Sequence, residues 1–410
     1  MKTPVAALLL LVLASSCLGM GFGPATVRVE RTWTIVSSGG YYFEGALAVN
    51  DSNQKVLGIE TDPPMQVVSD QEGNIRLRYN GTESTLRASA VVLVDFNSDI
   101  RADPALGRTW PLNATNLTRW NPDIAAAADG LAANTTLETV RNITNFVHGY
   151  ITYNDSYFGR VLSATDVYAV RQGVCVEYSH LTISMARYLG MDTRFVSGFV
   201  NGGGWQPHAW AEIYVPGYGW LPVDSTFGEA GMLDNSHVAG EKGRDQNDVF
   251  DIVRSLGPGN GGLRFNTSGT AEFINQSNDP KGRSLSFVFD GPAHELNVTL
   301  ENGRDDYVFG MYQAQLSGAG GVNESTVVLL GPYENAAREY GLDFSMLKPG
   351  YHYTMPLAAS LDDASVSGNL SLDVAALPAP GTNGGGNEPA QACPTAFLLL
   401  GLLVLYPSRQ

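Results

Sequence analysis

Cysteine is scarce in this chain, and its placement says more than its number. Only 3 cysteines occur in 410 residues. Cys17 and Cys393 lie in the terminal segments, so Cys175 has no partner in the body of the chain. This excludes a fold held together by disulfides. A lone thiol is open to oxidation unless chemistry uses it, which makes Cys175 the first candidate for a functional residue.

Positive charge is also scarce. The chain has 25 Lys and Arg against 41 Asp and Glu, a formal net charge of −16. Because phosphate binding needs clustered cationic side chains, this balance argues against nucleic acid as a partner. Residues 245–248 (Asp-Gln-Asn-Asp) lack the glycine and the terminal glutamate of a calcium-binding loop. We therefore expect a solvated loop there, and neither a metal nor a cofactor.

Long apolar runs are missing from the body of the chain, but short ones lie at its ends. Lys2 precedes an apolar run over residues 5–13, and small residues follow. This is the order of a signal peptide, which we place at residues 1–19. Cys17 follows the small residues, so lipid attachment after cleavage is an open alternative. We expect the chain to be exported.

The other end resembles a surface-sorting signal. Residues 377–394 are rich in Gly and Pro, the composition of a linker. The apolar run inside residues 395–410 is shorter than the roughly 20 residues that a free membrane-spanning helix needs. With Cys393-Pro394 before it and Arg409 after it, this end resembles the C-terminal sorting signals of archaeal surface proteins. The alternative is one short membrane-embedded helix. Both interpretations predict attachment to the membrane at the cell surface.

Sequons for N-glycosylation fit an exported protein. The pattern Asn-x-Ser/Thr is frequent, and none of its occurrences lies between Cys175 and Asp224. We expect at least some of these sites to carry glycans. They are Asn50, Asn80, Asn113, Asn116, Asn134, Asn142, Asn154, Asn266, Asn275, Asn297, Asn323 and Asn369.

The spacing of apolar residues divides the chain into three parts. Residues 25–118 hold short β-type segments separated by turn residues, which is typical of a small all-β domain. Residues 119–262 open with helical spacing, for example at Val140, Ile143 and Val147. β-type alternation returns over residues 263–376 and predicts a β-sandwich. The expected order is a β domain, an α+β core and a β-sandwich.

Cys175 is predicted to lie at the start of a helix. Ser163 or Thr165 caps a preceding helix, which Gly173 breaks. After Cys175, apolar residues recur at positions 178, 181, 185 and 189, one face of a helix that Gly190 closes. The N–H groups and the positive dipole end of such a helix favour a thiolate and could hold a developing oxyanion. A purely structural cysteine gains nothing from this position.

A predicted β-hairpin brings a histidine and an aspartate together. His208 begins the first arm and Asp224 ends the second. With a five-residue loop, Tyr214 pairs with Trp220. Asp224 then lies opposite Trp210, diagonal to His208 and on its face. A shift of one residue would turn Asp224 to the other face, so this prediction depends on the register.

Four ordered blocks carry a resemblance to a known family. They are Gly-Val-Cys-Val-Glu-Tyr at residues 173–178, Gly-Met-Asp-Thr-Arg-Phe-Val-Ser-Gly-Phe at 190–199, His-Ala-Trp-Ala-Glu-Ile-Tyr-Val at 208–215 and Gly-Trp-Leu-Pro-Val-Asp-Ser-Thr at 219–226. Here the chain resembles the transglutaminase-like superfamily, over about residues 120–240. The resemblance implies a papain-like α+β core, flanked by β domains, with Cys175, His208 and Asp224 as catalytic triad.

The chemistry of these residues predicts an acyl-transfer enzyme. His208 would accept the thiol proton, Asp224 would fix its tautomer, and Cys175 would attack an amide carbonyl to form a thioester. Water then gives hydrolysis, and an amine such as lysine gives a cross-link. The glycine-rich loop over residues 201–206 gives the site little cover, so we favour a peptidase or amidase acting on proteins or peptides at the cell surface. The alternative is a non-catalytic binding or structural protein with the same fold.

Other residues near the motifs receive smaller roles. Trp205 and Trp210 flank His208 and are candidates for substrate binding, with packing as the favoured role of Trp210. Glu177 is expected to be a surface acid that complements the helix dipole, and His180 a residue at the edge of the core. Residues 234–237 (Asp-Asn-Ser-His) could shape the rim of the site.

Overall fold

The computed structural model describes residues 23–96, 114–231, 233–257, 263–277, 283–290, 294–317, 321–362 and 364–374. The predicted signal peptide, the Gly/Pro-rich linker and the C-terminal apolar run lie outside the described residues. Within those ranges no helix combines the length and the apolar character needed to cross a membrane.

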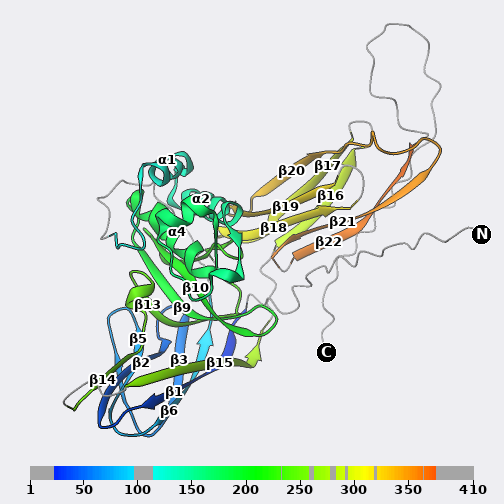
Figure 1. The fold of residues 1–410 in the computed structure, drawn as a ribbon. Helices are drawn as coiled ribbons and strands as arrows, with labels where there is room; N and C mark the ends of the chain where they lie inside the picture. The colour runs from blue at the N-terminus through cyan, green and yellow to red at the C-terminus, as the bar shows by residue number, and fades with distance from the viewer. Residues whose placement is uncertain are drawn as a thin grey trace, which may run out of the picture.

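Two four-stranded sheets form an N-terminal β-sandwich (Figure 1). Their strand orders are β15-β1-β6-β3 and β14-β2-β5-β4. Alternate residues of β1 are buried, as expected of an antiparallel strand with one face on a core. The strands are β1 (Ala25–Val36), β2 (Tyr41–Val49), β3 (Gln54–Asp62), β4 (Gln66–Ser69), β5 (Asn74–Gly81), β6 (Thr85–Val94), β14 (Ile252–Ser255) and β15 (Arg264–Gln276).

The last two of these strands come from far along the chain. β15 pairs with β1 along its whole length, from Ala25 opposite Gln276 to Val36 opposite Arg264. The boundary expected between the core and the C-terminal β-sandwich, at residues 262 and 263, is therefore misplaced, because β15 follows it and completes the N-terminal sheet. β14 lies in the range expected for the core, yet it pairs with β2. Alternation in the sequence identifies a strand, but it does not say which sheet edge the strand covers.

The central α+β core carries the predicted motifs. Its sheet has the order β12-β11-β10-β9-β13, and α4 packs on β9 and β10. The helices are α1 (Pro122–Leu131), α2 (Thr136–Tyr150), α3 (Ala164–Val170) and α4 (Cys175–Tyr188), with 3₁₀ turns η1 (Asp155–Tyr157) and η2 (Gln246–Asp248). The strands are β7 (Thr152–Tyr153), β8 (Gln172–Gly173), β9 (Thr193–Asn201), β10 (Trp205–Val215), β11 (Gly219–Asp224), β12 (Glu229–Ala230) and β13 (His237–Gly243).

A second sandwich follows the core and has its own hydrophobic interior. Its sheets have the orders β16-β17-β20 and β19-β18-β21-β22. Asn145 of α2 joins it to the core, because its amide bonds both the N–H and the C=O of Val327 in β19. The strands are β16 (Arg283–Asp290), β17 (Glu295–Asn302), β18 (Val308–Leu316), β19 (Val322–Leu330), β20 (Asn335–Gly341), β21 (His352–Leu361) and β22 (Ala364–Asp373).

The N-terminal sandwich packs directly against the core sheet. Phe199 of β9, Trp210 of β10 and Val238 of β13 belong to the same buried cluster as the sandwich interior. The side-chain amide of Gln54 also bonds the backbone of Ala239 twice, each time at 2.9 Å. One face of the core sheet therefore contacts α4, and the other contacts the N-terminal sandwich.

Asp251, just before β14, bonds side chains of β1, so a substitution there tests how strongly this late segment stabilises the N-terminal sandwich. Its Oδ2 accepts hydrogen bonds from Trp33 Nε1 at 2.7 Å and Arg31 Nη2 at 2.9 Å, and Trp33 is fully buried. Asp251→Ala leaves the indole N–H unpaired, so we expect the free energy of unfolding to fall by about 3 kcal/mol. Urea unfolding followed by tryptophan fluorescence measures this.

The matched control for Asp251 is Glu272→Ala. Glu272 pairs with Arg28 at 3.3 Å, but both side chains are exposed, so its loss should change the free energy of unfolding by less than about 1 kcal/mol. Equal losses in the two variants would contradict the role assigned to Asp251.

Candidate active site

The backbone around Cys175 is shaped by two helix ends. Ser163, one of the two N-cap residues that the sequence leaves open, caps α3 and forms a capping box with Asp166. α3 ends at Val170 because Arg171 adopts a left-handed conformation, with φ of 55°. β8 follows, and α4 then begins at Cys175, where the sequence places it.

Glu177 holds the start of α4 from inside the protein. It is fully buried and accepts hydrogen bonds from Val174 N at 2.9 Å and Leu162 N at 3.1 Å. Burial raises the pKa of its carboxyl, although these backbone bonds oppose the shift. A Cβ at Gly173 would lie 2.4 Å from Glu177 Cβ, which explains the glycine before Val174. The expectation of a surface acid was wrong because Glu177 turns back to cap the backbone.

His180 is also deeper than the sequence suggests. It lies fully inside the core rather than at its edge, with Nδ1 at 2.9 Å from Leu162 O. Burial lowers the pKa of its ring to about 4. His180 is therefore a neutral side chain that, with Glu177, fixes Leu162 beside α4.

The hairpin adopts the register that a shared face of His208 and Asp224 requires. Tyr214 pairs with Trp220 and Ala211 with Val223. His208 Nε2 lies 2.6 Å from Asp224 Oδ2, and both side chains are buried. The register predicted from the sequence is confirmed.

Asp224 accepts hydrogen bonds at both of its carboxylate oxygens. Its Oδ1 accepts a hydrogen bond from Thr226 N at 2.8 Å, while Oδ2 faces His208. Burial by itself would raise the pKa of Asp224, but the charge and hydrogen bonds of the histidines around it outweigh burial and lower the pKa well below its usual range. Asp224 is therefore a carboxylate.

The pairing with Asp224 also determines the pKa of His208. Burial would lower the pKa of its ring, but Asp224 and then Cys175 outweigh it and raise the pKa to about 9. Cys175 is itself buried, and its effect on the pKa of His208 indicates that the thiol lies near the ring. Since Nε2 is bonded to Asp224, Nδ1 is the nitrogen that remains for the thiol proton. Chemically, this arrangement can hold a thiolate beside an imidazolium.

His237 is a part of the cluster that the sequence did not reveal. Its Nε2 lies 3.2 Å from Asp224 Oδ2 and its Nδ1 lies 2.9 Å from Asp234 Oδ1. Both residues are buried, so residues 234–237 lie behind Asp224 and not at the rim of the site. In the sequence, only the Asp-Asn-Ser-His motif at residues 234–237 drew attention to this segment, and it did not show that the His237 ring faces Asp224.

Tyr153 is a second residue that sequence reasoning missed. β7 pairs with β8 in parallel, which sets Tyr153 beside Gly173, two residues before Cys175. Its side chain is 44% exposed and its ring centroid lies 6.2 Å from that of Tyr178. Burial of its hydroxyl, followed by the nearby Cys175, raises its pKa to about 12. A two-residue strand leaves no periodicity from which this placement could be predicted.

The two tryptophans proposed for substrate binding have other neighbours. Trp210 is 2% exposed, so substrate cannot reach it, and its ring centroid lies 6.2 Å from that of His208 and 5.5 Å from that of His237. Its role is packing. Trp205 is half-buried and contacts Phe273 of β15 at 5.0 Å, so a role in substrate binding stays a prediction.

Two sets of described side chains are close enough together to share a cation. They are His208, Asp224 and His237, and Glu229, Asp234 and His237, with potential ligand atoms within 4.8 Å of one another. The histidine and aspartate atoms of these sets are already paired at 2.6 to 3.2 Å, the spacing of direct hydrogen bonds. Hydrogen bonding therefore accounts for these contacts.

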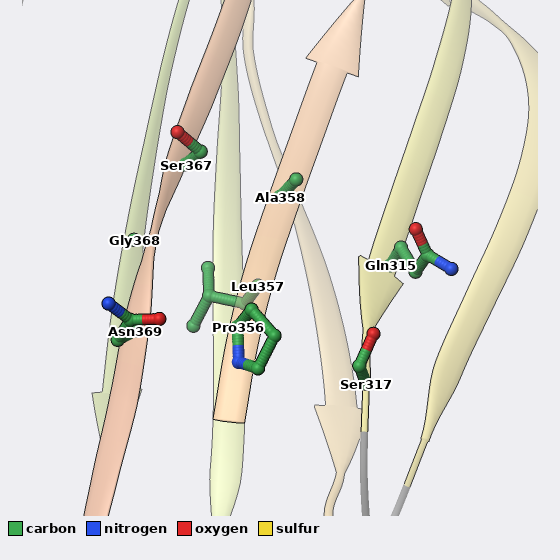
Figure 2. A pocket seen from close by; sticks show the side chains of 8 residues that line it. All are labelled: Gln315, Ser317, Pro356, Leu357, Ala358, Ser367, Gly368 and Asn369. Atoms are coloured by element: carbon green, nitrogen blue, oxygen red, sulfur yellow. The ribbon is translucent and has the colours of Figure 1, made fainter. Parts of the chain in front are cut away.

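A hollow elsewhere on the molecule is separate from this cluster. It has a volume of about 390 Å³ and none of its lining residues belongs to the core sheet or to α4. Figure 2 shows it at β18, β21 and β22, lined by Gln315, Ser317, Pro356, Leu357, Ala358, Ser367, Gly368 and Asn369.

Comparison with known proteins agrees with this geometry. Residues 124–225 match the transglutaminase-like superfamily. Uncharacterized proteins of Mycobacterium tuberculosis and Mycobacterium bovis are 25% identical over 138 residues, 30% of this chain and 43% of theirs. The chain thus spans less than half the length of the curated relatives it matches.

Two solved structures align with the chain at low identity and with TM-scores below 0.5. A proposed cysteine protease from Cytophaga hutchinsonii aligns over 63% of this chain and 93% of its own, with 21% identity and a TM-score of 0.44. Red sea bream transglutaminase aligns over 82% and 77%, with 11% identity and a TM-score of 0.24. The family match and the observed elements confirm the predicted fold class, an α+β, papain-like transglutaminase core flanked by β domains.

The pairing of His208 with Asp224 predicts a measurable titration. In Asp224→Asn the ring stays buried but loses the charge that offsets burial, so we expect the pKa of His208 to fall from about 9 to near or below 6.5. NMR of histidine-labelled protein measures it. Asp129→Asn is the control, because that carboxylate bonds Tyr188 instead, at 2.8 Å. An unchanged pKa in Asp224→Asn would show that another group protonates the ring.

Proposed function

We propose that this protein is an exported thiol enzyme that acts on protein or peptide amides through Cys175, His208 and Asp224. The observation that carries the proposal is the buried pair of His208 and Asp224 at 2.6 Å, near enough to Cys175 for that residue to help raise the pKa of His208. A thiol at the first turn of a helix beside a raised-pKa imidazole is poised as a nucleophile.

The reaction uses each group in turn. The Cys175 thiol gives its proton to His208 Nδ1, and Sγ attacks the amide carbonyl carbon. The C–N bond breaks as His208 returns the proton to the leaving amine, which leaves a thioester on Cys175. Water or a second amine then attacks the thioester carbonyl and gives its own proton to His208. The C–S bond breaks, and Cys175 leaves as a thiol by taking that proton back from His208. Water thus releases an acid, and an amine forms a new amide.

The fold offers support for the developing charge. The first N–H groups of α4 have no helical acceptor of their own and lie at the positive end of the helix dipole. They are suited to hold the carbonyl oxygen as it becomes an oxyanion. Tyr153, exposed beside Cys175, is the side chain best placed to contact a bound substrate.

Export and surface attachment belong to the same proposal. They rest on the terminal segments and on the sequons, several of which are exposed in the structure, namely Asn50, Asn80, Asn134, Asn266, Asn323 and Asn369. An archaeal origin rests only on the C-terminal resemblance, since the matched relatives are mycobacterial.

Alkylation by iodoacetamide tests for an activated thiol. At pH 6 we expect Cys175 to be labelled at least about tenfold faster than free cysteine, because the imidazolium stabilises its thiolate. His208→Ala should abolish this advantage, whereas His352→Ala, an exposed position in β21, should keep it. Mass spectrometry of the Cys175 peptide measures the rate. Labelling as slow as free cysteine would favour a non-catalytic surface protein.

A second experiment separates hydrolysis from cross-linking. The loop before His208 carries three exposed glycines, at residues 202–204, which offer no side chains to shield a thioester, so we expect water to be the acceptor. The protein is incubated with a glutamine-containing protein and a fluorescent primary amine, and peptide cleavage, ammonia and amine incorporation are measured. Cys175→Ala is the inactive control. Amine incorporation in excess of the other two products would overturn the hydrolytic preference.

A further inference from the structure

A second histidine stands behind the proposed triad. His237, at the start of β13, is 1% exposed and contacts a carboxylate with each ring nitrogen. Nε2 lies 3.2 Å from Asp224 Oδ2, and Nδ1 lies 2.9 Å from Asp234 Oδ1. Asp224 Oδ2 is also the atom that accepts from His208, at 2.6 Å. One carboxylate oxygen is therefore shared by two imidazole rings.

This geometry fixes the charge of His237. A neutral imidazole carries one N–H and can donate one hydrogen bond. Two carboxylates, one at each nitrogen, need two donors, so the ring is an imidazolium. Burial opposes this charge, but the bonds to Asp224 and Asp234 outweigh it and raise the pKa of His237 well above its ordinary value.

The groups that face His237 come from several elements. Glu229 of β12 has its Oε2 4.0 Å from Nδ1. Burial, and then the Asp234 charge, raises the pKa of Glu229 well above its ordinary value. The other titratable groups that face the ring are Asp224 of β11 and Asp234 of the β12–β13 connection, with His208 of β10 across the shared oxygen. Phe227 and Trp210 cover the rest of the ring, at 6.0 Å and 5.5 Å.

We propose that His237 is a positioning residue that holds Asp224 from behind and moderates its pull on His208. The effect of His237 on catalysis rests on the proposed function, whereas its contact with Asp224 and its effect on the pKa of His208 do not. The contact with His237, together with that from Thr226 N, fixes both oxygens of Asp224. The positive ring, 5.7 Å from that of His208 between centroids, also repels a proton on His208. His208 therefore gives up its proton to a leaving amine more readily than Asp224 alone would allow.

Two substitutions separate the charge from the hydrogen bond. His237→Gln keeps a neutral donor within reach of Asp224 but removes the charge. We expect the pKa of His208, measured by NMR of histidine-labelled full-length protein, to rise by on the order of one unit. His237→Ala also removes the donor and frees Asp224, so alkylation of Cys175 at pH 6 should slow by on the order of 10²-fold in that variant and much less in His237→Gln.

The control is His180→Gln, which alters an equally buried histidine that contacts Leu162 rather than Asp224. It should leave the pKa of His208 unchanged. Thermal melts show whether each variant is folded. If His237→Ala does not fold, the pKa of His208 in His237→Gln decides alone.

Three results would overturn the proposal. One is an unchanged or lowered pKa of His208 in His237→Gln. Another is equal alkylation rates in folded His237→Gln and His237→Ala. The third is one equivalent of tightly bound metal in the purified wild type that is lost in His237→Gln, because Nδ1 would then be a ligand and not a donor. Slow alkylation of wild-type Cys175 would instead remove the proposed function and leave the NMR result for His237 standing.

Discussion

A single buried carboxylate constrains this core. Asp224 has no exposed surface, and an ionised carboxylate in such a place is costly unless donors surround it. Its donors are His208 Nε2, His237 Nε2 and Thr226 N, supplied by β10, β13 and the turn after β11. The strand register and the order of the sheet must both be right for these three donors to converge. The hydrogen bonds of Asp224 therefore depend on the correct fold of the whole core sheet.

The N-terminal sandwich helps to hold the core sheet in place. β13 is the edge strand of the core sheet, and an edge strand is free to move unless something covers it. Gln54 bonds its backbone at Ala239, while Trp210 packs in the cluster that the sandwich and the core sheet share. β15 then completes the sandwich after the core has been built. The domain that lacks catalytic groups thus holds the strand that carries His237.

Sequence patterns were sufficient where a local rule applied. The start of α4 at Cys175 follows from helical spacing. The hairpin sequence leaves two registers open, and the observed one is the register that places Asp224 on the face of His208. Local rules could not predict contacts between residues that lie far apart in the chain. No local signal could show that β15 pairs with β1, that Glu177 folds inward or that His237 points at Asp224. Trp210 was ambiguous for the same reason, since the residues that bury it lie far away in the chain.

The two sides of the His208 ring differ in a way that bears on the proposed chemistry. Behind it, Phe227 and Trp210 cover the ring and the carboxylate network, so the charges that tune His208 are shielded from water and interact strongly. In front of it, Cys175 lies beside Tyr153, whose side chain is 44% exposed. Cys175 itself is only 5% exposed, so the free protein already shields the nucleophile as well as the charges that tune His208. Whether water or an amine attacks a thioester there depends on how far a bound substrate changes that cover.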